Sequence, residues 1–164
     1  MQFSFHAPTQ IIFGSGTAND IPARAATLGT RVCLVTGSNP GRLTWLEYGL
    51  AQEGLSPLVV SVGQEPDTDY IAQAATQVRE HGCDVVIAVG GGSVLDAGKA
   101  LAALITNTGE LFDYLEVVGQ GQALSQQPVP CIAAPTTAGT GSEATANAVL
   151  LATEQGVKVS MRHV

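Results

Sequence analysis

The sequence predicts an α/β fold in which a doubly wound, mostly parallel sheet carries helices on both faces. Short apolar runs rich in β-branched residues alternate four times with amphipathic stretches of helical length, and a glycine closes most of these stretches. The 164 residues fit one domain, and with 45% hydrophobic and 13% charged residues they can bury a sizeable core. Aromatic residues are only 5% of the chain, which favours an α/β fold over an all-β barrel.

The expected elements follow from these runs in chain order. Strands at residues 3–6 and 10–13 are expected to form an N-terminal β-hairpin at a sheet edge. A first helix, capped by Thr17 or Asn19, is expected to end before Gly29. The remaining expected strands cover residues 32–36, 58–62, 84–89 and 129–134, with a second hairpin at 149–153 and 157–161. The remaining expected helices cover residues 43–53, 70–81 and 93–106, and residues 107–128 are expected to form a less regular surface segment.

Charge and cysteine content narrow the function classes. The net charge is −7 with only seven Lys and Arg residues, which argues against nucleic acid as the main partner but leaves room for one nucleotide. No apolar run reaches transmembrane length and no basic leader precedes an apolar core, so no membrane partner and a cytoplasmic location are expected. The three cysteines, Cys33, Cys83 and Cys131, lie far apart without a CxxC pair, which predicts reduced thiols in the core. The three histidines, His6, His81 and His163, do not have the spacing of metal ligands.

The stretch over residues 85–100 carries the first chemical motif. Five apolar residues of a buried strand lead into Gly90-Gly91-Gly92, and a helix begins at Ser93. This layout delivers backbone N–H groups to a phosphate at a helix N-terminus. Leu95 stands where two common glycine motifs require glycine, so a plain packing turn remains the alternative.

Two charged residues in that helix admit two interpretations each. Asp96 either complements the helix dipole or hydrogen-bonds a ligand beside the phosphate site. Lys99 either pairs with Asp96 one turn earlier or reaches a bound cofactor.

A second polar loop follows the strand at residues 129–134. Hydroxyls and free amides at the carboxyl end of a parallel strand suit ribose and phosphate recognition. An ordinary polar turn with self-capping side chains is the alternative. The threonines of this loop are Thr136, Thr137, Thr140 and Thr145.

Together the two loops, Gly90 to Lys99 and Pro135 to Thr145, resemble the iron-containing (group III) alcohol dehydrogenases. Ile12 to Gly16 and the hairpin strand Ala148 to Leu151 are also similar to that family. The resemblance covers the whole chain and implies that residues 1–164 form a Rossmann-like NAD(P)-binding domain.

The resemblance also implies roles for individual residues. Gly91, Gly92 and Ser93 would hold the pyrophosphate, and the adenosine side would be lined by Thr136, Thr137 and Thr140. The nicotinamide half would lie along Asp96, Thr145, Val149 and Lys158, although Lys158 also reads as a solvated charge of the hairpin. Many family members carry an acidic residue where this chain has Gly37, Ser38 and Asn39. Without that carboxylate a 2′-phosphate is not rejected, so NADP is expected to be accepted, with NAD also open.

The family has a second, helical domain whose Asp and His side chains bind Fe²⁺ or Zn²⁺, and this chain is expected to lack it. The chain is therefore expected to bind NAD or NADP without catalytic or metal-binding residues of its own, and to be inactive alone. The intact enzyme would interconvert an alcohol and an aldehyde or ketone, with a homodimer as a candidate assembly. The alternative is a stand-alone, non-catalytic nucleotide-binding or assembly module.

Overall fold

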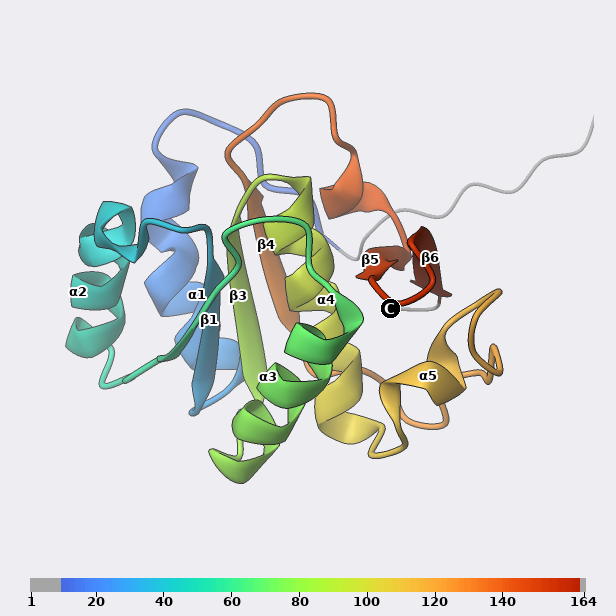
Figure 1. The fold of residues 1–164 in the computed structure, drawn as a ribbon. Coiled ribbons are helices and arrows are strands. Elements are labelled where there is room, and N and C mark those ends of the chain that lie inside the picture. Colours follow the sequence, from blue (N-terminus) through green and yellow to red (C-terminus); the bar gives the residue numbers. More distant parts are fainter. Residues whose placement is uncertain (1–9, 163–164) are drawn as a thin grey trace, which may run out of the picture.

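The computed structural model describes residues 10–162, and their centre is a four-stranded sheet in the order β2-β1-β3-β4 (Figure 1). All three strand pairings are parallel. This confirms the doubly wound parallel sheet expected from the sequence. The four strands are β1 (Val32–Thr36), β2 (Leu58–Ser61), β3 (Val85–Gly90) and β4 (Cys131–Pro135).

Helices cover both faces of the sheet, and a two-stranded antiparallel hairpin packs against α4 on one of these faces (Figure 1). One face carries α1 (Ile21–Leu28) and α2 (Thr44–Gln52), and the other carries α3 (Thr68–Glu80) and α4 (Gly92–Thr106). The hairpin consists of β5 (Asn147–Ala152) and β6 (Val157–Arg162). The short elements are α5 (Leu111–Tyr114) and the 3₁₀ turns Thr17–Asp20, Pro40–Leu43 and Ser142–Ala144.

The central strands are apolar throughout because both of their faces are covered. Val32 and Leu34 contribute to the core under α1 and α2, whereas Cys33 and Val35 contribute to the core under α3 and α4. Successive side chains of a strand point to opposite faces, so a continuous apolar run supplies both cores at once. All five residues of β1 are buried.

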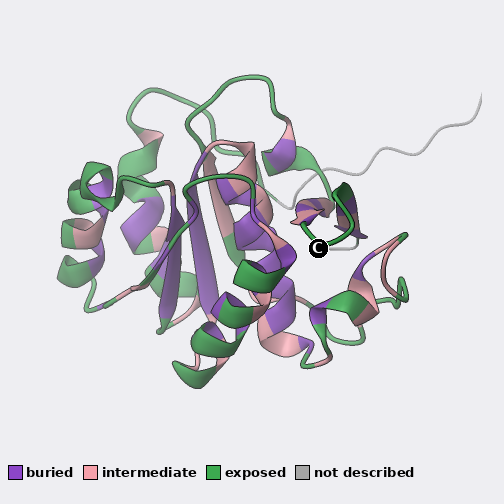
Figure 2. Ribbon diagram, in the orientation of Figure 1, coloured by how far each residue is buried: buried purple, intermediate pink, exposed green. Residues whose placement is uncertain are grey.

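Helix α4 is the most enclosed helix, because the sheet, α3 and the β5–β6 hairpin surround it (Figure 2). Ten of its residues are buried. A helix enclosed on all sides must be apolar around its circumference, which explains its run of Ala and Leu residues. Ala148, Leu150 and Met161 of the hairpin belong to the same core.

The structure corrects three expectations. Residues 10–13, expected as the second strand of the N-terminal hairpin, form no strand and are exposed, Phe13 completely, because no described strand pairs with them; residues 3–6 lie outside the described residues. Strand β4 was expected to be buried, but it is half-exposed because it ends the described sheet. The segment 107–128 contains a helical turn, α5, whose Leu111 is buried.

The three cysteines, all within the described residues, are free thiols. Cys33 and Cys83 are buried, and desolvation by burial raises the pKa of both thiols. Cys131 is exposed at the start of β4, so the expectation of a core thiol is wrong there. Among the described residues, no helix is long and apolar enough to cross a bilayer.

The order of the strands determines where a ligand can lie. The connection after β1 leads outward to β2, and the connection after β3 leads to β4 on the other side. Loops that follow neighbouring parallel strands and leave in opposite directions open a crevice between them at the carboxyl edge. The loops after β1, β2, β3 and β4 all meet at this edge.

Gly98 sets the distance between α4 and the sheet. A Cβ atom built on Gly98 would lie 2.5 Å from the Cβ atom of Ala88 in β3. Carbon atoms that are not bonded to each other do not approach this closely, so the helix can lie this close to the strand only with glycine at this position.

We expect Gly98→Ala to lower the free energy of unfolding by about 1–3 kcal/mol, because overpacking outweighs the helix propensity of alanine. Chemical denaturation measures the change. The double variant Ala88→Gly/Gly98→Ala removes the opposing methyl group and should recover part of the stability. A single variant more stable than the wild type would contradict the packing argument.

Asp84 ties the start of β3 to the turn before β1. Its carboxylate accepts hydrogen bonds from the backbone N–H groups of Thr30 and Arg31, both at 2.8 Å, and from the Thr30 hydroxyl at 2.9 Å. Burial alone would raise the pKa of Asp84. These hydrogen bonds and the nearby Arg31 charge outweigh burial and hold that pKa below its ordinary value.

The lowered pKa predicts acid-sensitive stability. The contribution of Asp84 is complete above the pKa of an unfolded Asp, about 4, and is lost as the pH falls through the lower folded value. We expect Asp84→Asn to cost about 1–3 kcal/mol at pH 7, and less in acid, in denaturation experiments at several pH values. Glu154→Gln, in the exposed β5–β6 turn, is the control. An equal loss for Asp84→Asn at pH 7 and pH 2 would contradict the assignment.

Candidate functional site

The turn after β3 presents the N-terminus of α4 to the carboxyl edge. The Gly91 carbonyl accepts the N–H groups of Val94 at 3.0 Å and Leu95 at 3.1 Å, which begins the helix. Within the described chain, the N–H groups of Gly92 and Ser93 have no acceptor. A 15-residue helix with free N–H groups at its first turn favours an anion there.

The threonine loop lies directly against this turn. The Thr136 N–H donates to the Gly90 carbonyl at 2.8 Å and extends the β3–β4 pairing by one residue. A Cβ atom on Gly91 would lie 3.5 Å from Thr137 Oγ1, and one on Gly92 would lie 3.4 Å from Thr140 Cβ. The structure therefore brings together two loops that are more than forty residues apart in the sequence, as their common position at the carboxyl edge predicts.

A cavity of about 170 Å³ lies beside the first turn of α4. It unites five of the residues proposed from the sequence, which come from α4, β5 and β6. These are Gly92, Ser93, Asp96, Val149 and Lys158, and the remaining lining residues are Glu65, Pro66, Leu150 and Leu151.

An ion pair between Lys158 of β6 and Glu65 stands at this cavity. Both side chains are about half exposed. Backbone hydrogen bonds fix the loop that carries Glu65 at both ends. The Val62 N–H donates to the Thr36 carbonyl at 2.7 Å, and the Leu151 N–H donates to the Pro66 carbonyl at 2.9 Å. Glu65 was not proposed from the sequence; its only signal is its position in the loop after β2.

Asp96 and Lys99 form a second, buried ion pair beneath the cavity wall. Lys99 Nζ lies 2.9 Å from Asp96 Oδ1, and the two side chains are 9% and 15% exposed. The same ammonium donates to the carbonyls of Ser142, at 2.8 Å, and Asn147, and the Ser142 hydroxyl donates to Asp96 Oδ1. The pairing of Lys99 with Asp96, one of the two alternatives, is present. Ser142 was not proposed; its signal is its place after the threonine-glycine run.

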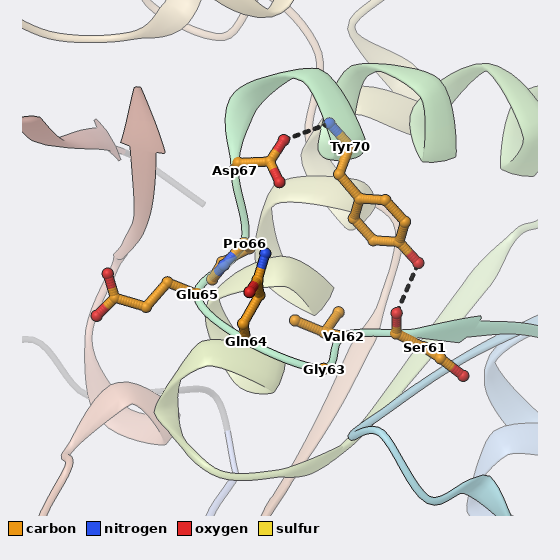
Figure 3. A pocket seen from close by; sticks show the side chains of 8 residues that line it. All are labelled: Ser61, Val62, Gly63, Gln64, Glu65, Pro66, Asp67 and Tyr70. Carbon is orange, nitrogen blue, oxygen red and sulfur yellow. Dashed lines mark hydrogen bonds between the residues drawn. The ribbon is translucent and has the colours of Figure 1, made fainter. Parts of the chain in front are cut away.

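A larger cavity of about 360 Å³ is lined by the loop after β2 and by Tyr70 of α3 (Figure 3). The Tyr70 hydroxyl donates to the Ser61 carbonyl at 2.7 Å, and Asp67 accepts the Tyr70 N–H at 2.8 Å. Burial raises the pKa of Tyr70, and the Asp67 carboxylate adds to this rise against the opposing Ser61 hydrogen bond. The lining includes two carboxylates and no cation, so this cavity is a poor anion site, and the smaller cavity at the α4 N-terminus is the better candidate.

The other proposed residues do not line the candidate cavity. Ser38 lies beside the loop after β2, because a Cβ atom built on Gly63 would lie 3.6 Å from the Cβ atom of Ser38, and Gly63 lines the larger cavity. Thr145 accepts from Lys99, with its hydroxyl oxygen 3.3 Å from the ammonium. The proposed residues outside the lining are Gly37, Ser38, Asn39, Gly91, Lys99, Thr136, Thr137, Thr140 and Thr145.

Metal ligands were not proposed for this chain. Over residues 10–162, no group of three or more His, Cys, Asp or Glu side chains is placed to hold a metal ion. The free amides at the first turn of α4 and Lys158 at the same cavity make the binding of a phosphate-containing ligand the candidate chemistry of this site.

Comparison with known proteins is consistent with this geometry. A family model described as iron-containing alcohol dehydrogenase matches residues 8–164. The chain is 35% identical to a probable alcohol dehydrogenase, EutG, of Escherichia coli K12, over 98% of this chain and 41% of that protein.

Two solved structures share the fold closely. NADH-dependent butanol dehydrogenase A of Thermotoga maritima matches with a TM-score of 0.87 and 27% identity, over 98% of this chain and 41% of that one. Sulfoacetaldehyde reductase of Bifidobacterium kashiwanohense, in complex with NAD⁺, matches with a TM-score of 0.84 and 31% identity, over 99% and 43%. This chain therefore spans less than half the length of these relatives.

Proposed function

We propose, from the premise that this chain belongs to the iron-containing alcohol dehydrogenase family, that it binds a nicotinamide dinucleotide as the cofactor-binding domain of an alcohol dehydrogenase. The intact enzyme would interconvert a small alcohol and an aldehyde or ketone. The observation that carries the proposal is the cavity at the N-terminus of α4, where free amides and Lys158 converge.

The residues present fit such a cofactor. Glycines at positions 91 and 92 leave the backbone N–H groups open to close approach by a pyrophosphate. Lys158 supplies a positive charge at the same cavity, and Asp96 supplies an acceptor for ribose hydroxyls or an amide group. The cavity thus offers donors for the anionic part of a dinucleotide and an acceptor for its neutral part.

The remaining proposed residues extend this site along the carboxyl edge. We assign the pyrophosphate to Gly91, Gly92 and Ser93. The adenosine side is assigned to the threonine loop, and the nicotinamide half to the walls formed by α4 and the hairpin. The adenosine residues are Thr136, Thr137 and Thr140, and the nicotinamide residues are Asp96, Thr145, Val149 and Lys158.

The described residues do not fit the family's catalytic metal, since they bring together no set of ligands. A bound nicotinamide would supply the hydride acceptor for alcohol oxidation. The residues of this chain orient that cofactor, and we propose no step of alcohol activation on them. The 164-residue chain alone is accordingly expected to bind cofactor without oxidising alcohol.

The loop after β1 supports acceptance of NADP as well as NAD. Gly37 follows β1 directly, and apart from Gly37 and its two chain neighbours no described heavy atom lies within 4 Å of the position that its Cβ would take. Residues 37–39 carry no carboxylate that would repel a 2′-phosphate, and Ser38 and Asn39 offer hydrogen-bond donors.

We expect Lys158→Met to weaken binding of NAD⁺ and NADP⁺ about tenfold, because it removes a charged donor from the cavity. Isothermal titration calorimetry measures both dissociation constants. Arg162→Met is the matched control: Arg162 is on the same strand and its side chain is equally exposed, at 60%, but it pairs with Glu116. Absence of binding of either dinucleotide to the wild-type chain would refute the proposed function.

We expect Gly37→Asp to weaken NADP⁺ binding at least tenfold while leaving NAD⁺ binding nearly unchanged or stronger. The new carboxylate would repel the 2′-phosphate and accept the ribose 2′-hydroxyl. Gly37→Ala, which adds a methyl group to the same open space, is the control. Equal weakening of both cofactors by Gly37→Asp would show that the loop after β1 does not read this phosphate.

A further inference from the structure

We propose that Lys99 is a positioning residue, which holds Asp96 and the segment 142–147 in place around the candidate cavity and does not itself touch the cofactor. The inference concerns the same site and, where it concerns affinity, rests on the proposed function. Three observations support this proposal. Every N–H of the Lys99 ammonium has an acceptor in the protein, only one of the two Asp96 carboxylate oxygens is used within the fold, and the segment that Lys99 contacts is largely exposed.

The Lys99 ammonium has no donor left for a ligand. It carries three N–H bonds, and three acceptors surround it: Asp96 Oδ1 at 2.9 Å, the Ser142 carbonyl at 2.8 Å and the Asn147 carbonyl. The carbonyl and hydroxyl oxygens of Thr145 add two longer contacts, at 3.4 and 3.3 Å. The Lys99 side chain is only 9% exposed, and all its hydrogen bonds are made within the protein. Its role is therefore to stabilise the fold around the site.

Asp96 divides its two oxygens between the fold and the cavity. Oδ1 accepts from both Lys99 and the Ser142 hydroxyl. The second oxygen, Oδ2, has no partner in the described chain, and Asp96 lines the cavity. Lys99 and Ser142 therefore determine which carboxylate oxygen remains available to a ligand and where it stands.

The segment 142–147 depends on the same ammonium. Residues 143–146 are all exposed, so little apolar burial orders them. Lys99 contacts the segment at its beginning, at Thr145 and at its end, where β5 starts. Because β5 carries Val149 into the cavity, one buried charge links the wall formed by α4 to the wall formed by the hairpin.

The test is Lys99→Met, which keeps the length of the side chain and removes its charge and donors. Hydrogen exchange of the cofactor-free chain should show amide exchange about tenfold faster in residues 142–147, with smaller changes in the sheet. Affinity for NAD⁺ should fall about tenfold or more. The effect on affinity should be strongly non-additive with that of Asp96→Asn, because Lys99 acts through Asp96.

Arg79→Met is the matched control. Arg79 ties the other end of α4, where it donates to the carbonyls of Leu104 at 2.6 Å and Asn107 at 3.0 Å. This variant should lower stability but leave exchange of residues 142–147 and cofactor affinity unchanged. If Lys99→Met behaves like Arg79→Met, the positioning role is wrong. If it weakens binding without faster exchange in the segment, Lys99 contacts the cofactor directly and the proposal is equally wrong.

Ser142→Ala covers the case in which Lys99→Met does not fold. It removes only the hydroxyl bond to Asp96 and leaves the carbonyl that Lys99 uses. NAD⁺ affinity should fall about threefold to tenfold, and thermal stability should fall modestly, because the hydroxyl donates to a mostly buried carboxylate. Unchanged affinity would show that this network does not hold Asp96 in place for the cofactor and would overturn the proposal. If wild type binds no dinucleotide, the proposed function fails, whereas the exchange experiment still decides whether Lys99 holds the segment.

Discussion

The close contact between α4 and β3 is the constraint on which the rest of the structure depends. Gly98 lets the helix lie against Ala88, and at the upper end of the contact a Cβ on Gly90 would lie 2.6 Å from the Cβ of Val94. These two glycines allow the helix to follow its strand by a tight turn, with its first N–H groups at the carboxyl edge. A helix displaced by even one methyl radius would move those groups away from the threonine loop and would loosen the apolar contacts with the hairpin.

The candidate site contains few charged side chains, and the whole chain has only seven Lys and Arg residues and a net charge of −7. Lys99 is neutralised by Asp96, and Lys158 is paired with Glu65, so neither cation acts as an isolated charge. The attraction for a pyrophosphate would come mainly from directed backbone N–H groups and the helix dipole. Such a site recognises the shape and position of a phosphate group, whereas a cluster of cations would attract any polyanion.

The cavity is assembled from segments that are distant in sequence. Its walls come from α4, from the loop after β2 and from the β5–β6 hairpin. The backbone bond from Leu151 to Pro66 and the bonds of Lys99 join these walls. These polar contacts lie over the apolar core that α4 shares with Ala148, Leu150 and Met161 of the hairpin, so both kinds of contact hold the walls of the cavity together.

The sequence by itself determined the sheet and its flanking helices, because local signals specify them: apolar runs of strand length, amphipathic spacing and glycine stops. It also placed the glycine turn and the threonine loop at one edge, since the carboxyl ends of parallel strands must share that edge. The tertiary structure alone decided which side chains meet there. The pairing of Glu65 with Lys158 joins residues 93 positions apart, and the bond of Ser142 to Asp96 joins residues 46 apart. No local periodicity encodes such contacts, because they depend on how the hairpin and the loops pack against α4.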